Sequence, residues 1–355
     1  MGCIHAHRSN GGVFCGPADN GGPVLRHALI ATATLATVGL LTTGSAHAAP
    51  AADNPWLDAR VMNMAHSGGE LEAPLNTMYA FDRAVGLGAD MIELDVQSTL
   101  DDRLVVLHDS SVDATTDGSG EVADLPLSEV RELDAAYNFV PDEGTVPDLP
   151  DSAYPLRGVR TGDVTPPAGY TADDFAIPTL AEVFERFPDT PINIEIKGSG
   201  LLNTESFLRN ARLLAQFLTE SGRTDVIVTS FNDAAVAEFH DLAPDVPLAP
   251  GTAGIAAYFF AGTAPIDGTV ALQIPVTLSN LLPIATESFV ERAHNDGYAV
   301  HVWFSGTAPD DVDTYRDILN TCADGLMPAR PQAFEDLLDE LDTVRPGRPG
   351  TDPCA

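Results

Sequence analysis

The chain has 355 residues, of which 44% are hydrophobic and 20% are charged, the composition of an ordinary globular protein. Only 18 residues are Lys or Arg against 52 that are Asp or Glu, so the formal net charge is −34. A charge of that sign disfavours nucleic acid and anionic membrane surfaces as partners, whereas it suits solubility and the recruitment of cations. Most of the excess fits a solvated acidic surface, typical of secreted or salt-adapted proteins.

The N-terminal segment has the pattern of a signal peptide. Arg26 and His27 precede an apolar stretch, residues 28–43, which is shorter than the ~20 residues of a membrane-spanning helix. An Ala-x-Ala pattern predicts cleavage after Ala48. We therefore expect residues 1–48 to be a leader, and the mature protein to be secreted without a stable membrane anchor.

Four cysteines occur, and their positions suggest one disulfide. Cys3 and Cys15 belong to the expected leader, so the mature chain keeps Cys322 and Cys354. Two cysteines in an exported protein favour a disulfide that fixes the coil tail, residues 343–355, although two free thiols remain the alternative.

The mature chain is expected to begin with an entry segment, residues 49–60, followed by a strand over 60–65. That strand ends in His66-Ser67-Gly68-Gly69, where two glycines allow a tight turn or close approach to a ligand. Apolar residues at helical spacing predict a helix over 76–87.

Residues 90–109 carry the strongest chemical signal. They predict two strands, 91–97 and 103–108, joined by a turn. Side chains two apart on a strand share a face, so Glu93 and Asp95 lie together. Two adjacent carboxylates on an otherwise apolar strand resist burial unless a cation lies between them. The second strand ends at His108, where barrel and open-sheet enzymes place their chemistry.

The rest of the chain alternates between helices and strands after a short helix, 127–134, and a long Pro/Gly/Asp-rich segment, 135–176. Further strands are predicted over 192–197, 226–231, 246–249, 271–275, 300–304 and 325–328, and further helices over 178–187, 204–222, 233–242, 287–296, 310–319 and 333–341, with a partly helical stretch before Gly262. About eight strands in this rhythm predict a (β/α)8 TIM barrel over residues 61–342 with a long loop insertion. An open doubly wound sheet is the alternative, although neither a Gly-x-Gly-x-x-Gly nor a Walker sequence favours it.

The strand over 192–197 also places Glu195 and Lys197 on one face, opposite three isoleucines. Lys197 is the only lysine in the chain. Its ammonium suits contact with a phosphoryl or carboxylate oxygen, and a structural Glu–Lys pair inside a barrel is the alternative. Together with the carboxylates described above, these side chains favour Ca2+ or Mg2+ over zinc. Two nearby histidines, His66 and His108, suit acid–base displacement at phosphorus.

Several short motifs, in this order, resemble those of the glycerophosphodiester phosphodiesterase family. They are His66-Ser67-Gly68-Gly69, Pro74-Leu75-Asn76-Thr77, Ala80-Phe81, Gly88-Ala89-Asp90, Ile92-Glu93-Leu94-Asp95-Val96, His108-Asp109, Glu195-Ile196-Lys197, Ser230-Phe231, Val302-Trp303 and Asp324-Gly325. The resemblance implies a TIM barrel that holds a divalent cation.

The same resemblance implies a role for each candidate residue. Glu93, Asp95 and Glu195 would hold the metal, His66 and His108 would be the acid–base pair, Lys197 would contact the phosphate, and Ser67 and Trp303 would lie against the substrate. On sequence alone, Trp303 could equally belong to the core.

The sequence departs from the family pattern at two positions. The family usually has Arg where this chain has Ser67, and Glu where it has Leu75. The missing Arg removes a bidentate phosphate contact. Glu70 and Glu72 could replace the acidic group but not the positive charge.

These features predict a secreted, metal-dependent phosphodiesterase. It would hydrolyse a small-molecule glycerophosphodiester to glycerol 3-phosphate and an alcohol. Two alternatives remain at this point: a phospholipase D-like enzyme, lyase or hydrolase, acting on lysolipid or sphingolipid head groups, and a catalytically inactive barrel.

Overall fold

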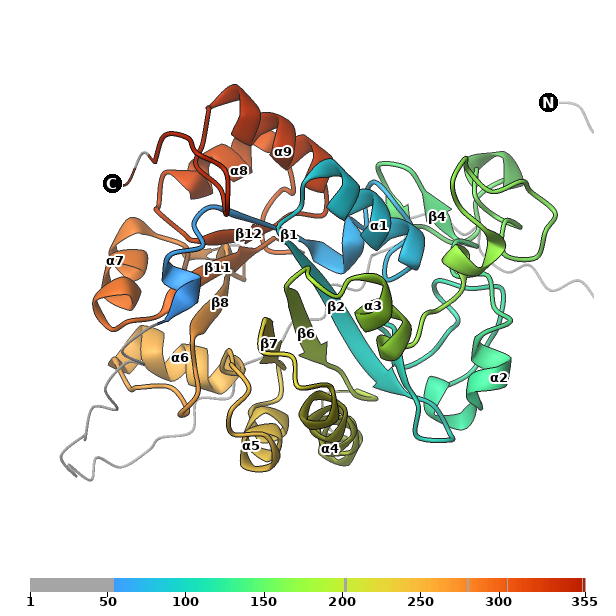
Figure 1. Cartoon of the computed structure of the whole chain (residues 1–355), viewed down its shortest axis with the longest axis horizontal. Helices are drawn as coiled ribbons and strands as arrows, with labels where there is room; N and C mark the ends of the chain where they lie inside the picture. The colour runs from blue at the N-terminus through green and yellow to red at the C-terminus, as the bar shows by residue number, and fades with distance from the viewer. Residues whose placement is uncertain (1–53, 201–202, 280, 305, 353, 355) are drawn as a thin grey trace, which may run out of the picture. The chain divides into compact units, whose positions relative to one another are not determined.

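The computed structural model describes residues 54–200, 203–279, 281–304, 306–352 and 354; the expected leader lies outside these ranges. Seven parallel strands form a curved sheet in the order β7-β6-β2-β1-β12-β11-β8 (Figure 1). Their bounds are β1 (Met62–Ala65), β2 (Met91–Ser98), β6 (Ile192–Ile196), β7 (Val226–Thr229), β8 (Ala271–Pro275), β11 (Ala299–Trp303) and β12 (Gly325–Met327). This arrangement is the α/β barrel that the sequence predicts.

The eighth position of the barrel lies between β7 and β8 and is very short. Leu248 makes parallel bridges to Val228 of β7 and to Thr269, just before β8. The Leu248 amide donates to the carbonyl of Gly268 at 3.0 Å, and the Ala249 amide donates to the carbonyl of Val228 at 2.9 Å. The strand predicted over 246–249 is thus reduced to these bridges, yet it closes the barrel.

Helices follow most strands and surround the sheet (Figure 1). They are α1 (Met78–Leu87), α2 (Leu127–Val130), α3 (Leu180–Arg186), α4 (Thr204–Ser221), α5 (Asp233–Leu242), α6 (Thr252–Ala261), α7 (Glu287–Asn295), α8 (Val312–Leu319) and α9 (Pro331–Glu340). Local sequence explains their ends. The Thr77 hydroxyl accepts from the Ala80 amide at the start of α1, and Gly88 ends the helix at φ 116°.

The core has an inner and an outer layer. Inside the barrel, methionines and small side chains from several strands pack together, among them Met62, Met64 and Met91. Outside it, Ile92, Leu94 and Val96 of β2 are fully buried in the same apolar cluster as side chains of α3, α4 and α5. The intervening carboxylates of β2 therefore belong to the inner face, as the alternation predicts.

The long segment 135–176 is an ordered insertion with a small core of its own. It contains a hairpin of β4 (Phe139–Val140) and β5 (Gly144–Thr145). Its residue Phe175 is fully buried and stacks on Tyr79 of α1, with ring centroids 4.8 Å apart. The sequence predicts the insertion but gives no sign of its hairpin, since each strand has only two residues.

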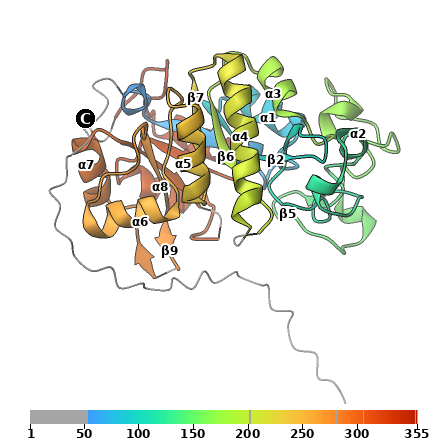
Figure 2. The ribbon, with the colours of Figure 1, turned by 90° about the horizontal axis from the view of Figure 1, so that it is seen from below.

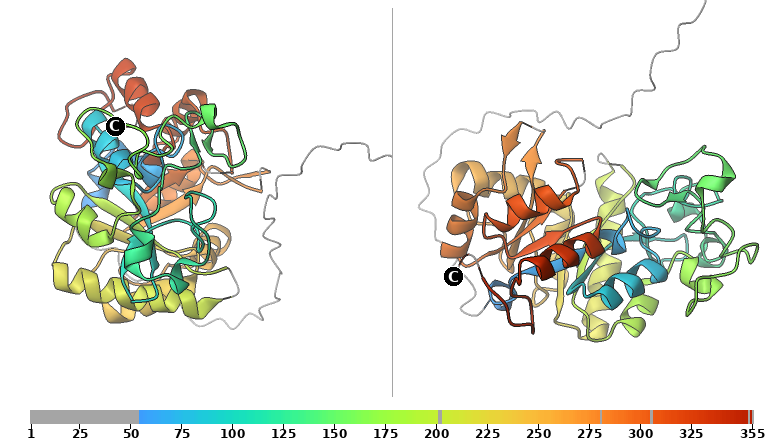
Figure 3. Two further views of the ribbon diagram at one scale, coloured as in Figure 1. Left: turned by 90° about the vertical axis from the view of Figure 1, so that its right-hand side faces the viewer. Right: turned by 90° about the horizontal axis from the view of Figure 1, so that it is seen from above.

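Two further hairpins leave the barrel strands. β3 (Leu104–Val106) pairs antiparallel with the end of β2, as expected from residues 90–109. After β8, β9 (Thr277–Leu278) pairs antiparallel with β10 (Leu282–Pro283), which the sequence did not indicate. Figure 2 and the right panel of Figure 3 show this second hairpin projecting beyond the neighbouring helices.

The C-terminal tail is fixed to the barrel. Cys322 and Cys354 form the expected disulfide, with their Cα atoms 5.8 Å apart. Arg60 pairs with Asp352 at 3.1 Å. None of the helices in the described ranges is long and apolar enough to cross a membrane.

Candidate active site

Three carboxylates from adjacent strands meet inside the barrel. Glu93 and Asp95 lie on β2, and Asp95 is directly opposite Glu195 of β6 in the parallel register. One oxygen of each side chain lies within 4.8 Å of the others. The three residues are 3%, 2% and 9% exposed, so these carboxylates are buried together.

Lys197 supplies a positive charge to this cluster. Its Nζ lies 3.1 Å from Asp95 Oδ1 and 2.8 Å from Glu195 Oε1. Burial alone would lower the pKa of Lys197, but the two carboxylates raise it, so the side chain stays charged. The lone lysine of the chain therefore lies where the sequence predicts, beside the carboxylates on the same barrel face.

One ammonium cannot balance three buried carboxylates. Burial and the neighbouring charge of Asp95 raise the pKa of Glu93 to about 7, and burial raises the pKa of Glu195. Burial also opposes ionisation of Asp95, but Lys197 and other partners hold its pKa below its usual range. The excess negative charge and the oxygen-only donors fit a hard divalent cation such as Mg2+ or Ca2+.

His66 follows β1 and lies at the edge of the carboxylate cluster. Its Nε2 is 4.0 Å from Glu93 Oε2, and its Nδ1 is 3.2 Å from Glu70 Oε1. Burial by itself would lower the pKa of His66, but Glu70, Glu93 and Asp95 together raise it to about 10. Glu70 thus fixes the orientation of the ring and helps to keep it protonated.

His108 is more accessible. Its Nδ1 lies 2.7 Å from Asp109 Oδ1, and its side chain is 48% exposed. The charge of Asp95 raises the pKa of His108, against the effect of burial, and the hydrogen bond with Asp109 acts in the same direction. Asp95 therefore influences both histidines, and each ring has its own carboxylate partner on Nδ1.

Ser67 occupies a strained and fully buried position, with φ 47° and ψ 28°. Its amide donates to Glu93 Oε2 at 2.8 Å, and its hydroxyl donates to Asp95 Oδ2 at 3.3 Å. Ser67, which stands where the family usually has Arg, thus contacts two of the carboxylates. Its contact with a substrate stays a prediction.

The acidic residues considered as replacements for the family's Glu have different positions. Glu70 contacts His66, as described above, and so belongs to the site. Glu72 instead accepts from Arg83 Nη1 at 2.8 Å and from the amides at the start of α9. Glu72 is therefore part of the packing between α1 and α9.

Asn76 is a site residue to which sequence reasoning gave no role. It has φ 55°, is 3% exposed, and its Nδ2 donates to Asp95 Oδ2 at 2.8 Å. The available signal was its place in the Pro-Leu-Asn-Thr motif, since asparagine tolerates the left-handed region better than most residues.

An aromatic wall borders the carboxylates. Trp303 is the last residue of β11, and its ring meets that of Phe231 nearly edge-on, with centroids 5.6 Å apart. Phe231 is 46% exposed, and Lys197 Nζ lies 5.6 Å from its ring centroid. The structure thus places Trp303 beside the site. Phe231, which belongs to the Ser230-Phe231 motif but was given no role there, is a second lining residue.

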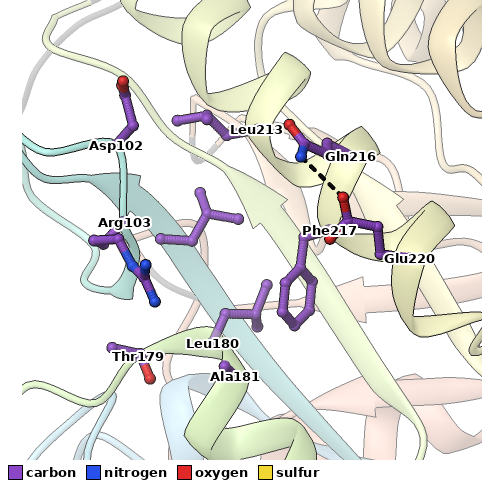
Figure 4. Close-up of a pocket in the computed structure, with 10 residues that line it drawn as sticks. Asp102, Arg103, Thr179, Leu180, Ala181, Leu213, Gln216, Phe217 and Glu220 are labelled. Atoms are coloured by element: carbon purple, nitrogen blue, oxygen red, sulfur yellow. Dashed lines mark hydrogen bonds between the residues drawn. The ribbon is translucent and has the colours of Figure 1, made fainter.

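Two cavities lie elsewhere on the described part of the chain. One, of about 260 Å3, lies between β3, α3 and α4 and contains none of the predicted site residues (Figure 4). The other, of about 440 Å3, is lined by the loop after His108 and the loop after Lys197, including Glu121, Asp124 and Ser199. Only the second cavity is lined by loops that directly follow predicted site residues.

Comparison with known proteins agrees with the fold. The model of the glycerophosphoryl diester phosphodiesterase family matches residues 66–326. The chain is 35% identical over 191 residues to a glycerophosphodiester phosphodiesterase of Caldanaerobacter subterraneus, covering 53% of this chain and 65% of that protein. It is 30% identical over 200 residues to one of Bacillus subtilis, covering 53% and 58%. These matches span less than two thirds of each relative.

Solved structures share the fold at lower identity. A glycerophosphoryl diester phosphodiesterase of Silicibacter pomeroyi superposes with a TM-score of 0.61 and 18% identity, covering 81% of this chain and 96% of that one. A phosphodiesterase of Oleispira antarctica, solved with the product sn-glycerol-3-phosphate, has a TM-score of 0.54 and 22% identity, covering 79% and 96%. At such identities the likeness shows the barrel fold alone.

Proposed function

Because this chain belongs to the glycerophosphoryl diester phosphodiesterase family, we propose that it is a metal-dependent phosphodiesterase. It hydrolyses glycerophosphodiesters to sn-glycerol 3-phosphate and an alcohol. The observation that carries this proposal is the buried cluster of three carboxylates with one lysine, bordered by two histidines. The Oleispira antarctica structure with sn-glycerol-3-phosphate supports the choice of product.

Glu93, Asp95 and Glu195 are the residues that would hold the cation. One oxygen of each lies within 4.8 Å of the others, and Lys197 is the one ammonium in the described part of the chain that pairs with them. A divalent cation at this position would polarise a phosphoryl oxygen and offset charge in the transition state. The experiment below distinguishes Ca2+ from Mg2+.

His66 and His108 are proposed as the acid–base pair. One ring takes a proton from the water whose oxygen forms the new bond to phosphorus, and the other gives a proton to the alcohol oxygen as its bond to phosphorus breaks. The carboxylates on both Nδ1 atoms leave Nε2 as the reactive nitrogen of each ring. The pKa values of both rings are raised, which suits the ring that acts as the proton donor. Compensation of the carboxylate charge by a cation would bring one ring closer to the basic form.

Two further residues are proposed to contact the substrate, and a third to position the metal ligands. Lys197 would bind a phosphate oxygen, and Trp303 would pack against the apolar side of the glycerol or alcohol group. Ser67, which is fully buried, would hold Glu93 and Asp95 in place through its two hydrogen bonds.

The experiment that tests this function measures release of glycerol 3-phosphate from glycerophosphocholine, with EDTA and after addition of Ca2+ or Mg2+. We expect EDTA to abolish activity and one cation to restore it. His66→Ala and His108→Ala should each lower kcat by about 10²-fold or more, as expected for loss of a general acid or base.

His240→Ala is the matched control, because His240 lies on the outer helix α5. It should retain the activity of the unmodified chain. Hydrolysis that continues in EDTA, or that survives removal of both site histidines, would contradict the proposed mechanism.

We also propose that the protein is exported, as its N-terminal sequence predicts. The Cys322–Cys354 disulfide supports this, since disulfides persist in oxidising compartments.

A further inference from the structure

One stretch of this acidic chain is almost free of charge. Between Asp245 and Glu287, the only charged residue is Asp267, although one residue in five is charged in the chain as a whole. The stretch includes α6 and the β9–β10 hairpin. A surface built from it therefore differs in chemistry from the rest of the molecule.

Several large apolar side chains of this stretch are exposed. On the hairpin, Leu278 is 47%, Leu281 is 87% and Leu282 is 39% exposed. On α6, Phe260 is 67% exposed. We call these four residues the apolar rim. Single exposed apolar residues are common, but three exposed leucines on one projecting hairpin, with an exposed phenylalanine on a helix that shares its support, are typical of an interaction surface.

The rim lies at the catalytic end of the barrel. The hairpin follows Pro275, the last residue of β8, which is paired with Trp303 of the aromatic wall. The Val276 amide donates to the Trp303 carbonyl at 3.2 Å. Since all the barrel strands are parallel, the hairpin leaves the same end that carries the carboxylates.

The base of the hairpin is fixed, so the rim is held away from the barrel. The Ile284 amide donates to the Val276 carbonyl at 3.1 Å, and Ile284 is buried in the same apolar cluster as Phe289. Phe259 of α6 stacks on Phe289, and the ring of Phe260 meets that of Phe259 at 4.9 Å. The hairpin and α6 therefore share one support, the apolar cluster around Phe289.

We propose that the apolar rim docks the protein on a zwitterionic lipid surface. Only the reason for docking rests on the proposed function. Glycerophosphodiesters are phospholipids that have lost both acyl chains, so deacylation at a lipid surface supplies the substrate at that surface. A net charge of −34 opposes anionic lipid, whereas uncharged leucines at a projecting tip suit the interface of a neutral bilayer.

The alternative occupants are less compatible with the position of the rim. A protein partner or a second copy of the chain that covered the hairpin would also cover the edge of the active site, next to Trp303. A lipid surface reached by a narrow hairpin leaves the site open to solutes.

The first experiment places a fluorophore on the rim. Leu281→Trp should show fluorescence that brominated phosphatidylcholine vesicles quench beyond the quenching of the unmodified full chain, which has two tryptophans. Leu242→Trp is the matched control, because Leu242 is 52% exposed at the end of α5, away from the rim. It should show no added quenching.

The second experiment measures sedimentation with phosphatidylcholine vesicles. The triple variant Leu278→Ser/Leu281→Ser/Leu282→Ser should partition about tenfold less than the unmodified full chain, because three apolar side chains leave the interface. Leu242→Ser should partition like the unmodified chain. All proteins carry the same N-terminal segment, so the difference reports on the hairpin.

Equal partitioning of the triple variant and the unmodified chain, or absence of added quenching in Leu281→Trp, would overturn the proposal. A dimer that the triple variant dissociates, with no vesicle binding, would assign the rim to a second copy instead. Hydrolysis of soluble glycerophosphocholine should be unchanged in the triple variant. Loss of vesicle binding and loss of the proposed catalytic function are therefore measured separately.

Discussion

Asp95 receives more contacts than any other carboxylate of the site described above. Lys197 pairs with one of its oxygens, while Asn76 and Ser67 donate to the other. These partners fix the carboxylate in one orientation before a cation binds, which lowers the entropic cost of binding. Metal affinity should therefore depend on neighbours that are not themselves ligands.

The residue-scale prediction concerns Asn76. Asn76→Gly keeps the left-handed backbone, φ 55°, but removes the amide that donates to Asp95. We expect cation affinity to fall by about 10–100-fold, as for other outer-shell partners of metal ligands. Isothermal titration with Ca2+ and Mg2+ measures this change.

Asp342→Gly is the matched control, since Asp342 also has a positive φ, 51°, and follows α9. It should bind the cation as the unmodified chain does. An affinity that is the same in Asn76→Gly and in the control would show that Asp95 needs no support from the amide.

The sequence allowed prediction of those site residues that depend on strand alternation. Glu93 and Asp95, like Glu195 and Lys197, are two apart on a strand, so their common face follows from the period of the strand alone. The contacts of Asn76 and Glu70 depend instead on turn geometry after β1, where Ser67 and two glycines have positive φ. No sequence period encodes such a turn.

At the scale of elements, the start of β2 is tied to β1 and α9 through hydrogen bonds of polar side chains. Asp90 Oδ2 accepts from the Asn63 amide at 2.9 Å, and Asn63 Nδ2 donates to Glu335. Burial raises the pKa of Asp90 to about 7, against the hydrogen bond from Asn63. The folded protein therefore binds a proton here that the unfolded chain releases near pH 4.

This shift predicts a pH dependence of stability. Because the pKa of Asp90 is higher in the folded state, its contribution to stability is greatest below about pH 4 and is lost as the pH rises to about 7. Asp90→Asn removes the titration and keeps an acceptor for Asn63. We expect the Tm of the unmodified chain, relative to that of the variant, to fall between pH 4 and 7.

Thermal unfolding of both proteins across this range measures the difference. If the difference in Tm between the two proteins did not change with pH, the raised pKa of Asp90 would be contradicted. A difference that grows in the opposite direction, with the unmodified chain gaining stability toward pH 7, would mean that Asp90 is ionised and stabilised in the folded state.

The predicted elements were most accurate where apolar runs are long. β2 and β6 were placed within one or two residues, since isoleucine and valine alternate with polar residues over a whole strand. The two hairpins β4–β5 and β9–β10 were missed because each of their strands has two residues, too few to show a period. They are set by tertiary packing, such as the burial of Ile284 below the β9–β10 hairpin.

At the scale of the whole molecule, the C-terminal tail joins distant parts of the chain. The disulfide links Cys354 to Cys322, and Arg345 pairs with Glu335 of α9 at 2.7 Å. The whole-molecule prediction follows from the proposed export. The protein recovered from the culture medium of its source should have the intact mass of residues 49–355 with both remaining cysteines oxidised.

Mass spectrometry before and after reduction and alkylation measures both properties. Alkylation of the two cysteines only after reduction would support export and oxidation together. A chain found only inside the cell, with its N-terminal segment intact, would contradict the proposal.

The barrel has one weak seam. Every other pair of neighbouring barrel strands shares a ladder, whereas β7 and β8 are joined only through the bridges of Leu248. If the hydrogen bonds around Leu248 broke, the barrel would become a seven-stranded sheet with two free edges, β7 and β8. An exposed strand edge is a template for pairing with another chain. The same few hydrogen bonds that complete the barrel therefore also protect the protein from aggregation and strand exchange between molecules.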